Sequence, residues 1–222
     1  PRTIFKDNYS WSEYILNRMM KIKNVNWIIK DHPSQPFYKS RKNFNEKINM
    51  LNKNYNHIKS FPSNYDASSL KHIADVAITS HGTAGIEYPS FGINSIYVEN
   101  SFYSNLNFTN KINKKNDLDK TLENLNNLKK LNQTIINKSN VFLYIRYELL
   151  QSKCSLLSPH DTSRQINESD FWRKNAKKAK NFSFKGDELY KMFKFQLKYN
   201  LRHTVNLNKL NLKKKYYNDL SE

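Results

Sequence analysis

The sequence predicts an α/β fold in which a parallel sheet is followed by a helical C-terminal extension. Short apolar runs alternate with amphipathic segments along the first part of the chain, a succession typical of βαβ units. Three of the four glycines fall between residues 82 and 92, which indicates that the backbone turns sharply or approaches another group closely there. After about residue 158 no strand pattern recurs. We therefore expect two domains, residues 1–157 with the sheet and residues 158–222 with basic helices.

The elements before the glycine cluster follow from capping signals and apolar spacing. Ser10 and Glu13 have the spacing of a capping box, with Ser10 as the N-cap. The expected order is a helix from Ser10 to Lys23, a strand at Asn26–Lys30, a helix at Arg41–Asn52, a strand at His57–Ser60 and a short helix at Ala67–Ile73 capped by Asp66.

The glycine-rich stretch itself predicts a strand, a turn, a helix and a second strand. Val76–Ile78 is a short apolar run of the length of a buried strand. The segment 80–83 (SHGT) breaks it, and a helix from Thr83 or Ala84 to Phe91 ends at Gly92, which supplies a left-handed stop. Ile93–Val98 then returns as a strand. Because the first N–H groups of such a helix point outward, the turn is a candidate anion site.

The elements after this stretch are predicted to be helical. Asp117 is the expected N-cap of a leucine-rich helix, and longer helical patterns cover 134–150, 171–180 and 187–201. In the last of these helices the expected apolar stripe consists of Leu189, Met192, Phe193 and Leu197.

Composition limits the class of protein without deciding it. The net charge of +18 in 222 residues favours an anionic partner such as a sugar nucleotide, nucleic acid, an acidic polymer or an anionic membrane. The single cysteine, Cys154, excludes an intrachain disulfide and fits a reducing compartment. Apolar runs fall short of a membrane span, and no D-x-D element occurs. We expect a cytoplasmic protein without a bound metal, on the inner face of the plasma membrane if its basic helices contact anionic lipid.

Polar residues follow two of the predicted strands directly. Lys30 and His32 end the first strand, and Ser80, His81, Gly82 and Thr83 follow the later one. Because ligands bind at the carboxyl ends of parallel strands, we expect these residues to face one crevice with the three main strands as neighbours in one sheet. His32 is the candidate catalytic residue, since imidazole can protonate a departing phosphate. Glu87, one helical turn inside, is positioned to accept hydrogen bonds from a ribose diol.

Three segments carry a family resemblance: 26–33 (NWIIKDHP), 74–92 (ADVAITSHGTAGIEYPSFG) and 99–108 (ENSFYSNLNF). Together they resemble the C-terminal half of the capsular polysaccharide glycosyltransferases of bacteria, a surface-carbohydrate family that includes Kdo transferases. The similarity runs from about Trp11 to Leu131. At His81 the family more often has a small or polar residue.

The resemblance implies a Rossmann-like lobe of a GT-B glycosyltransferase that holds a nucleotide-sugar, with CMP-Kdo favoured over UDP- and GDP-sugars. It adds Tyr103 and Ser104, from a loop like the family's donor loop, to the nucleotide-binding set of Lys30, Ser80, His81, Gly82, Thr83 and Glu87. It also implies an acceptor, a glycan or lipid-linked sugar, held by an N-terminal lobe. We expect that lobe on another part of a longer chain or on a partner.

A second function is compatible with the same sequence. Lysine-rich segments at 174–185 and 209–217 interleave phenylalanine and tyrosine, as nucleic-acid-binding surfaces do. The alternative is therefore a basic module that binds nucleic acid or an anionic glycan without catalysis. No recognisable nucleic-acid motif accompanies these segments, so we favour the transferase.

Overall fold

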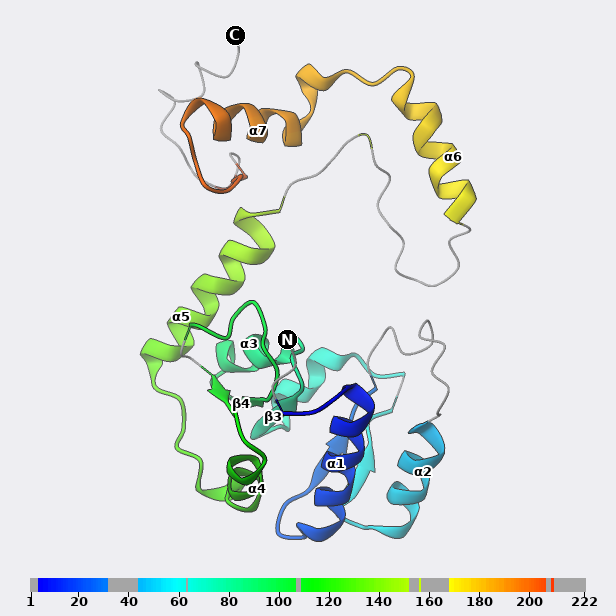
Figure 1. The fold of residues 1–222 in the computed structure, drawn as a ribbon, viewed down its shortest axis with the longest axis vertical. Coiled ribbons are helices and arrows are strands. Elements are labelled where there is room, and N and C mark those ends of the chain that lie inside the picture. Colours follow the sequence, from blue (N-terminus) through cyan, green and yellow to red (C-terminus); the bar gives the residue numbers. More distant parts are fainter. Residues whose placement is uncertain are drawn as a thin grey trace. The chain divides into compact units, whose positions relative to one another are not determined.

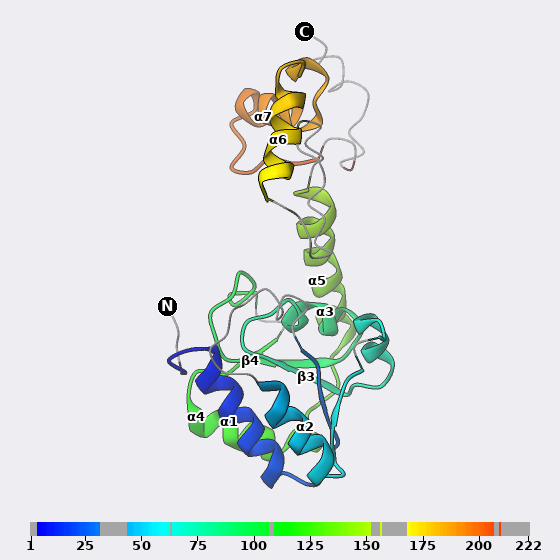
Figure 2. The same ribbon diagram turned by 90° about the vertical axis from the view of Figure 1, so that its right-hand side faces the viewer.

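The computed structural model describes residues 4–31, 44–62, 64–106, 109–151, 156, 168–206 and 209. The chain divides into two compact units, residues 1–140 (unit 1) and 141–222 (unit 2), shown in Figures 1 and 2. The boundary expected near residue 157 falls on a position outside the described residues. Unit 1 is mixed α/β with small parallel sheets, and the described part of unit 2 is helical.

Unit 1 alternates strands and helices as the sequence predicts. Its elements are α1 (Asn8–Lys21), β1 (Trp27–Ile29), α2 (Phe44–Asn54), β2 (Ile58–Ser60), a 3-10 helix (Ala67–His72), β3 (Val76–Thr79), α3 (Ala84–Ser90), β4 (Asn94–Tyr97), β5 (Asn110–Lys111), α4 (Lys115–Glu123), a second 3-10 turn (Leu125–Asn127) and the first part of α5 (Gln133–Tyr144), whose last four residues belong to unit 2. The short strand β5 lies in a segment for which we predicted no helix or strand.

Two helices begin earlier than predicted. The N-cap of α1 is Asp7, whose carboxylate accepts from the Ser10 N–H at 2.7 Å while the Ser10 hydroxyl accepts from the Asp7 N–H at 3.1 Å. The capping box therefore joins Asp7 to Ser10, and the predicted pairing of Ser10 with Glu13 is wrong. Likewise α4 is capped by Lys114. Asp117 lies inside its first turn, where a carboxylate favours the positive end of the helix dipole.

The strands form two small parallel sheets. β3, β4 and β5 pair in that order, with Val76 opposite Asn94 and Ile96 opposite Asn110. Among the strands that the structure describes, β1 pairs with β2 alone, Trp27 opposite Ile58. The prediction that β1 neighbours β3 and β4 in one sheet is therefore wrong, although β3 and β4 are parallel neighbours as expected.

β4 is covered on both faces, which explains why all four of its residues are buried. Alternate residues of a strand face opposite sides. The Ser95 hydroxyl donates to the carbonyl of Gly85 in α3 at 2.7 Å, whereas Ile96 and Val98 belong to the core formed with α1 and α4. Figure 2 shows α3 on one side of β3 and β4, and α1 and α4 on the other.

One hydrophobic core joins the two sheets of unit 1. Its buried members are Phe5, Ile15, Leu16, Met19, Ile22, Trp27, Leu51, Ile58, Ile96, Val98, Leu118 and Leu122. Trp27 and Ile58 come from the sheet of β1 and β2, and Ile96 comes from the other sheet. The two sheets are thus held together by side-chain packing, because strands of three or four residues offer few backbone groups for a wider ladder.

The C-terminal end of α3 has the predicted form. Gly92 follows the helix with φ of 79°, a left-handed conformation that glycine adopts without a steric penalty. α5 is hydrogen-bonded to α3, because the buried Ser139 hydroxyl of α5 donates to the Ile86 carbonyl of α3 at 2.8 Å. α3, the helix next to the candidate site, is therefore held at its C-terminal end by the Gly92 turn and within its length by the bond from Ser139.

Unit 2 contains α6 (Glu168–Ala179), a 3-10 turn (Phe184–Gly186) and α7 (Glu188–Lys198), besides a π-helical segment (Ile145–Leu149) that continues α5. Asp187 caps α7 by accepting from the Tyr190 N–H at 3.1 Å. The buried side chains of α7 are Met192 and Phe195. The predicted stripe is therefore wrong in two places, because Phe193 and Leu197 are exposed.

None of the helices within the described ranges has both the length and the apolar character needed to cross a lipid bilayer.

Candidate functional site

The turns that follow β3 and β4 are tied together at the carboxyl edge of the three-stranded sheet. The Ser80 carbonyl accepts from the N–H groups of Val98 and Glu99 at 3.1 and 2.9 Å. The carbonyl of the next residue, His81, accepts from the Ser101 hydroxyl at 3.3 Å. The main chain of the predicted SHGT turn is therefore held in place by the segment after β4.

Tyr103 holds the same turn in place through its side chain. Its side chain is fully buried, and its hydroxyl donates to the Gly82 carbonyl at 2.7 Å. The ring lies so close to Gly85 that a Cβ added there would be 2.2 Å from the Tyr103 hydroxyl oxygen. Burial raises the pKa of Tyr103 to about 12. Gly85 therefore serves the close approach of a tyrosine of the same chain, and Tyr103 positions the turn.

Three predicted site residues present side chains around the turn. His81 is exposed, with its Nδ1 3.2 Å from the Ser80 hydroxyl oxygen. Thr83 is exposed, and its hydroxyl makes no capping bond to α3. Glu87 is half-buried in the first turn of α3. Burial first, and then the Glu87 charge, raises the pKa of Tyr88. A hydroxyl and a carboxylate thus lie one helical turn apart, at Thr83 and Glu87, and the His81 imidazole comes two residues before Thr83.

Ser104 has a structural part in the loop after β4. Its hydroxyl oxygen accepts from the Ser101 N–H at 2.7 Å, and its carbonyl accepts from the Tyr97 hydroxyl at 3.3 Å. Both groups are thus used to close a tight turn. Ser104 holds the segment that carries Ser101, which in turn bonds to the His81 carbonyl.

Sequence reasoning missed three polar residues at this edge. Glu99 is buried directly after β4 and shares the Ser80 carbonyl. Asn100 follows it and accepts from the ammonium of Lys111 in β5 at 2.5 Å. The rule that singled out Ser80 and His81, a polar residue just after a strand, applies equally to Glu99 and Asn100. Lys111 was missed because β5 was not predicted.

Lys30 belongs to the other sheet. It follows β1, and its ammonium donates to the Asp31 carbonyl at 3.1 Å. The backbone of Ser68 lowers the pKa of Asp66 most, and the charges of Lys71 and Lys30 lower it further. Among the described residues, no hydrogen bond or ion pair joins Lys30 to the turn after β3. His32 lies outside the described residues, so the shared crevice stays a prediction.

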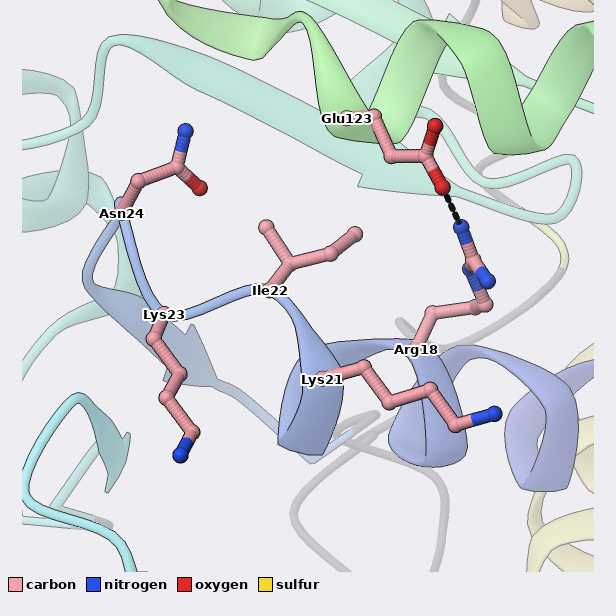
Figure 3. Close-up of a pocket in the computed structure, with 6 residues that line it drawn as sticks. All are labelled: Arg18, Lys21, Ile22, Lys23, Asn24 and Glu123. Atoms are coloured by element: carbon pink, nitrogen blue, oxygen red, sulfur yellow. Dashed lines mark hydrogen bonds and ion pairs between the residues drawn. The ribbon is translucent and has the colours of Figure 1, made fainter.

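A surface hollow elsewhere in unit 1 lies beside the segment that leads into β1, at the amino end of that strand. Figure 3 shows its lining, which is Arg18, Lys21, Ile22, Lys23, Asn24 and Glu123. These residues end α1 and α4 and precede β1, so they lie where strands begin. Arg18 there pairs with Glu123 and, at 3.1 Å, with Asp119. Its guanidinium therefore forms ion pairs that hold α1 against α4.

No group of three His, Cys, Asp or Glu side chains that could hold a metal ion occurs in the part of the chain that the structure describes. The charged groups near the turn include Glu87, Glu99 and Lys111, and His81 adds an imidazole. Their mixed signs suit a ligand that carries both acceptor groups and hydroxyl groups.

Comparison with protein-family models, curated proteins and solved structures found no match. The functional argument for this chain therefore depends on its own residues and on the motif resemblance described above.

Proposed function

We propose that unit 1 is the donor-binding lobe of a glycosyltransferase and holds a nucleotide-sugar at the carboxyl edge of β3, β4 and β5. The observation that carries the proposal is the convergence there of His81 and Thr83 after β3, Asn100 after β4, and Lys111 in β5. Parallel α/β sheets bind ligands at this edge. The motif resemblance adds the sugar nucleotide, CMP-Kdo before UDP- or GDP-sugars, and a role in surface polysaccharide synthesis.

Each side chain has a distinct part in this proposal. The Lys111 ammonium supplies positive charge, and the Lys111 ammonium and the His81 imidazole supply N–H donors for phosphate oxygens. The Thr83 hydroxyl, which has no capping bond, donates a further hydrogen bond. Glu87 accepts from the ribose hydroxyls, because its carboxylate is half-exposed one turn further along α3. Such a lobe promotes transfer by positioning the donor and stabilising the charge that develops on the leaving phosphate.

Tyr103 and Gly85 act on the ligand only through the backbone. They fix the carbonyl of Gly82, so that the turn does not rearrange when phosphate arrives. A site whose donors are held in advance binds without the entropic cost of ordering a loop.

Titration calorimetry of CMP, UDP and GDP into the full chain tests the proposal. Glu87→Ala should weaken nucleotide binding by about 1.5–3 kcal/mol, the range for a hydrogen bond to a charged group. Glu46→Ala removes an exposed carboxylate from α2 and should leave binding unchanged. The proposal is wrong if the folded chain binds none of the three nucleotides, or if the two variants weaken binding equally.

A further inference from the structure

α7 carries an apolar stripe that is largely exposed among the described residues of unit 2. Tyr190, Phe193 and Leu197 are spaced three and four residues apart, which places them on one face of the helix. Their exposed fractions are 38%, 49% and 80%. Met192 and Phe195, at 1% and 7%, form the buried face on the other side. The helix therefore has two apolar faces, of which its own unit uses one.

A row of lysines runs beside the exposed stripe. Lys191, Lys194 and Lys198 each follow a stripe residue by one position and are exposed. The Lys194 ammonium lies 6.0 Å from the centre of the Tyr190 ring. α7 thus presents tyrosine, phenylalanine and leucine with positive charges along one border.

α6 and the following turn repeat this combination. Trp172 is 62% exposed and Phe184 is 61% exposed, and Lys174, Lys177 and Lys178 of α6 are exposed as well. Residues 168–206 contain ten Lys and Arg against four Asp and Glu, a net charge of +6. The exposed apolar groups of unit 2 therefore lie in a strongly positive segment.

We propose that the stripe of α7, together with Trp172 of α6, docks unit 2 on the surface of an anionic lipid bilayer. The positive charge requires an anionic partner, and the exposed leucine selects among such partners. An aliphatic side chain gains free energy in hydrocarbon but does not stack on nucleic-acid bases as aromatic rings do.

The geometry suits a helix that lies in the membrane interface. α7 has 11 residues, about half of what a membrane span needs, so it lies along the surface with its stripe inward. Lysines at the border keep their ammonium groups at lipid phosphates, and tryptophan favours this depth. This inference does not depend on nucleotide binding by unit 1, and either proposal can fail without the other.

Vesicle flotation with the full chain tests the docking surface. The chain should bind vesicles that contain phosphatidylglycerol and not vesicles of pure phosphatidylcholine. Leu197→Glu should lower binding by about tenfold to a hundredfold, the effect of losing one buried leucine. The matched control is Ile73→Glu, because Ile73 is 61% exposed in unit 1, and it should have no effect.

Charge is tested separately with two pairs of lysines. Lys191→Gln with Lys194→Gln should lower binding to anionic vesicles by about twenty-fivefold, since each charge near the surface is worth about fivefold. Lys114→Gln with Lys120→Gln removes two exposed lysines of unit 1 and should leave it unchanged.

Tryptophan fluorescence locates the contact. Anionic vesicles should shift the emission to shorter wavelength, and Trp172→Phe should abolish the shift, because Trp27 is already buried and Trp11 packs on the core of unit 1.

Three outcomes overturn the proposal. The first is the absence of binding to anionic vesicles, or binding that Leu197→Glu does not change. The second is tight binding of single-stranded RNA that requires Phe193 while vesicles stay unbound, which makes the surface a nucleic-acid site. The third is a dimer in sedimentation that Leu197→Glu dissociates, which makes a second copy of the chain the occupant.

Discussion

The two units carry the same net charge but differ in how many of their apolar side chains are buried. Residues 141–222 hold 17 of the 37 Lys and Arg and 8 of the 19 Asp and Glu, a net charge of +9, and residues 1–140 hold the remaining +9. Unit 1 buries a cluster of twelve apolar residues, whereas the cluster around α7 buries two. Among the exposed large apolar residues described, ten of seventeen belong to unit 2.

The difference separates two uses of an apolar side chain. In unit 1 apolar burial stabilises a scaffold that brings polar groups to one edge of a sheet. In the described part of unit 2 a smaller core leaves apolar groups exposed, which is the arrangement that the proposed docking surface needs. The same charge then has different consequences, because the described part of unit 2 carries more of the exposed aromatic and aliphatic groups, ten against seven in unit 1.

Two leucines of opposite burial give the largest expected contrast. Leu118 in α4 is fully buried, and Leu197 in α7 is 80% exposed. Leu118→Ala should lower the free energy of unfolding of unit 1 by about 2–5 kcal/mol through the cavity it leaves. Leu197→Ala should change the stability by less than about 0.5 kcal/mol.

Urea unfolding followed by fluorescence measures this contrast. The variants are made in a Trp172→Phe background, which leaves Trp11 and Trp27, both in unit 1. Because these two report unit 1, stability of unit 2 is followed by circular dichroism. Comparable losses for the two leucines would remove the distinction between the units.

Two glycines sharpen the comparison further. A Cβ at Gly85 would be 2.6 Å from Cζ of Tyr103, whereas one at Gly186 has no atom within 4 Å. Gly85→Ala should therefore destabilise unit 1 by about 1–3 kcal/mol through overpacking, and Gly186→Ala should cost less than about 0.5 kcal/mol. Unfolding midpoints measure both. Equal effects would mean that Tyr103 does not lie against Gly85.

Alkaline pH gives a smaller effect that comes from two tyrosines of unit 1. Burial, and then a hydrogen bond to Asp119 at 2.5 Å, raises the pKa of Tyr14 from 10 to about 12, and burial raises that of Tyr103 to about 12. Because the folded pKa lies above the unfolded one, the stabilisation is fully present below pH 10 and is lost as the pH rises through 12.

Spectrophotometric titration checks these two tyrosines. Tyr14→Phe and Tyr103→Phe should each remove one late-titrating phenol and reduce the loss of unit 1 stability between pH 10 and 12. If both phenols ionise near pH 10 in the folded chain, the account of their burial is wrong.

Periodicity and glycine placement predicted the local elements of unit 1 well. Residues 76–98 form a strand, a turn, a helix that stops at Gly92, and a parallel strand, as expected. The sequence could not show that β1 would pair with β2 instead of joining the sheet of β3, β4 and β5, because this depends on side-chain packing between short strands. In α7, Phe193 and Phe195 are both apolar at neighbouring positions, and only tertiary contacts decide that Phe195 is buried.

The candidate site was predicted only in part. Ser80, His81 and Thr83 were found because a polar turn after a buried strand is visible in sequence. The roles of Gly85 and Tyr103 were not, since their contact joins residues 18 positions apart. Lys111 reaches Asn100 only through the pairing of β5 with β4, which two residues of strand do not reveal.

Glycine-selective ¹⁵N labelling of the full chain offers the most direct test of the central claim, that a nucleotide binds at the edge of β3. The chain has four glycines, so the spectrum holds four amide signals, and Gly186→Ala identifies one of them at little structural cost. CMP should shift the signals of Gly82 and Gly85 in the turn and first helical turn, and leave Gly186 in unit 2 unchanged. If CMP, UDP and GDP all leave Gly82 and Gly85 unmoved, the edge of β3 is not a nucleotide site.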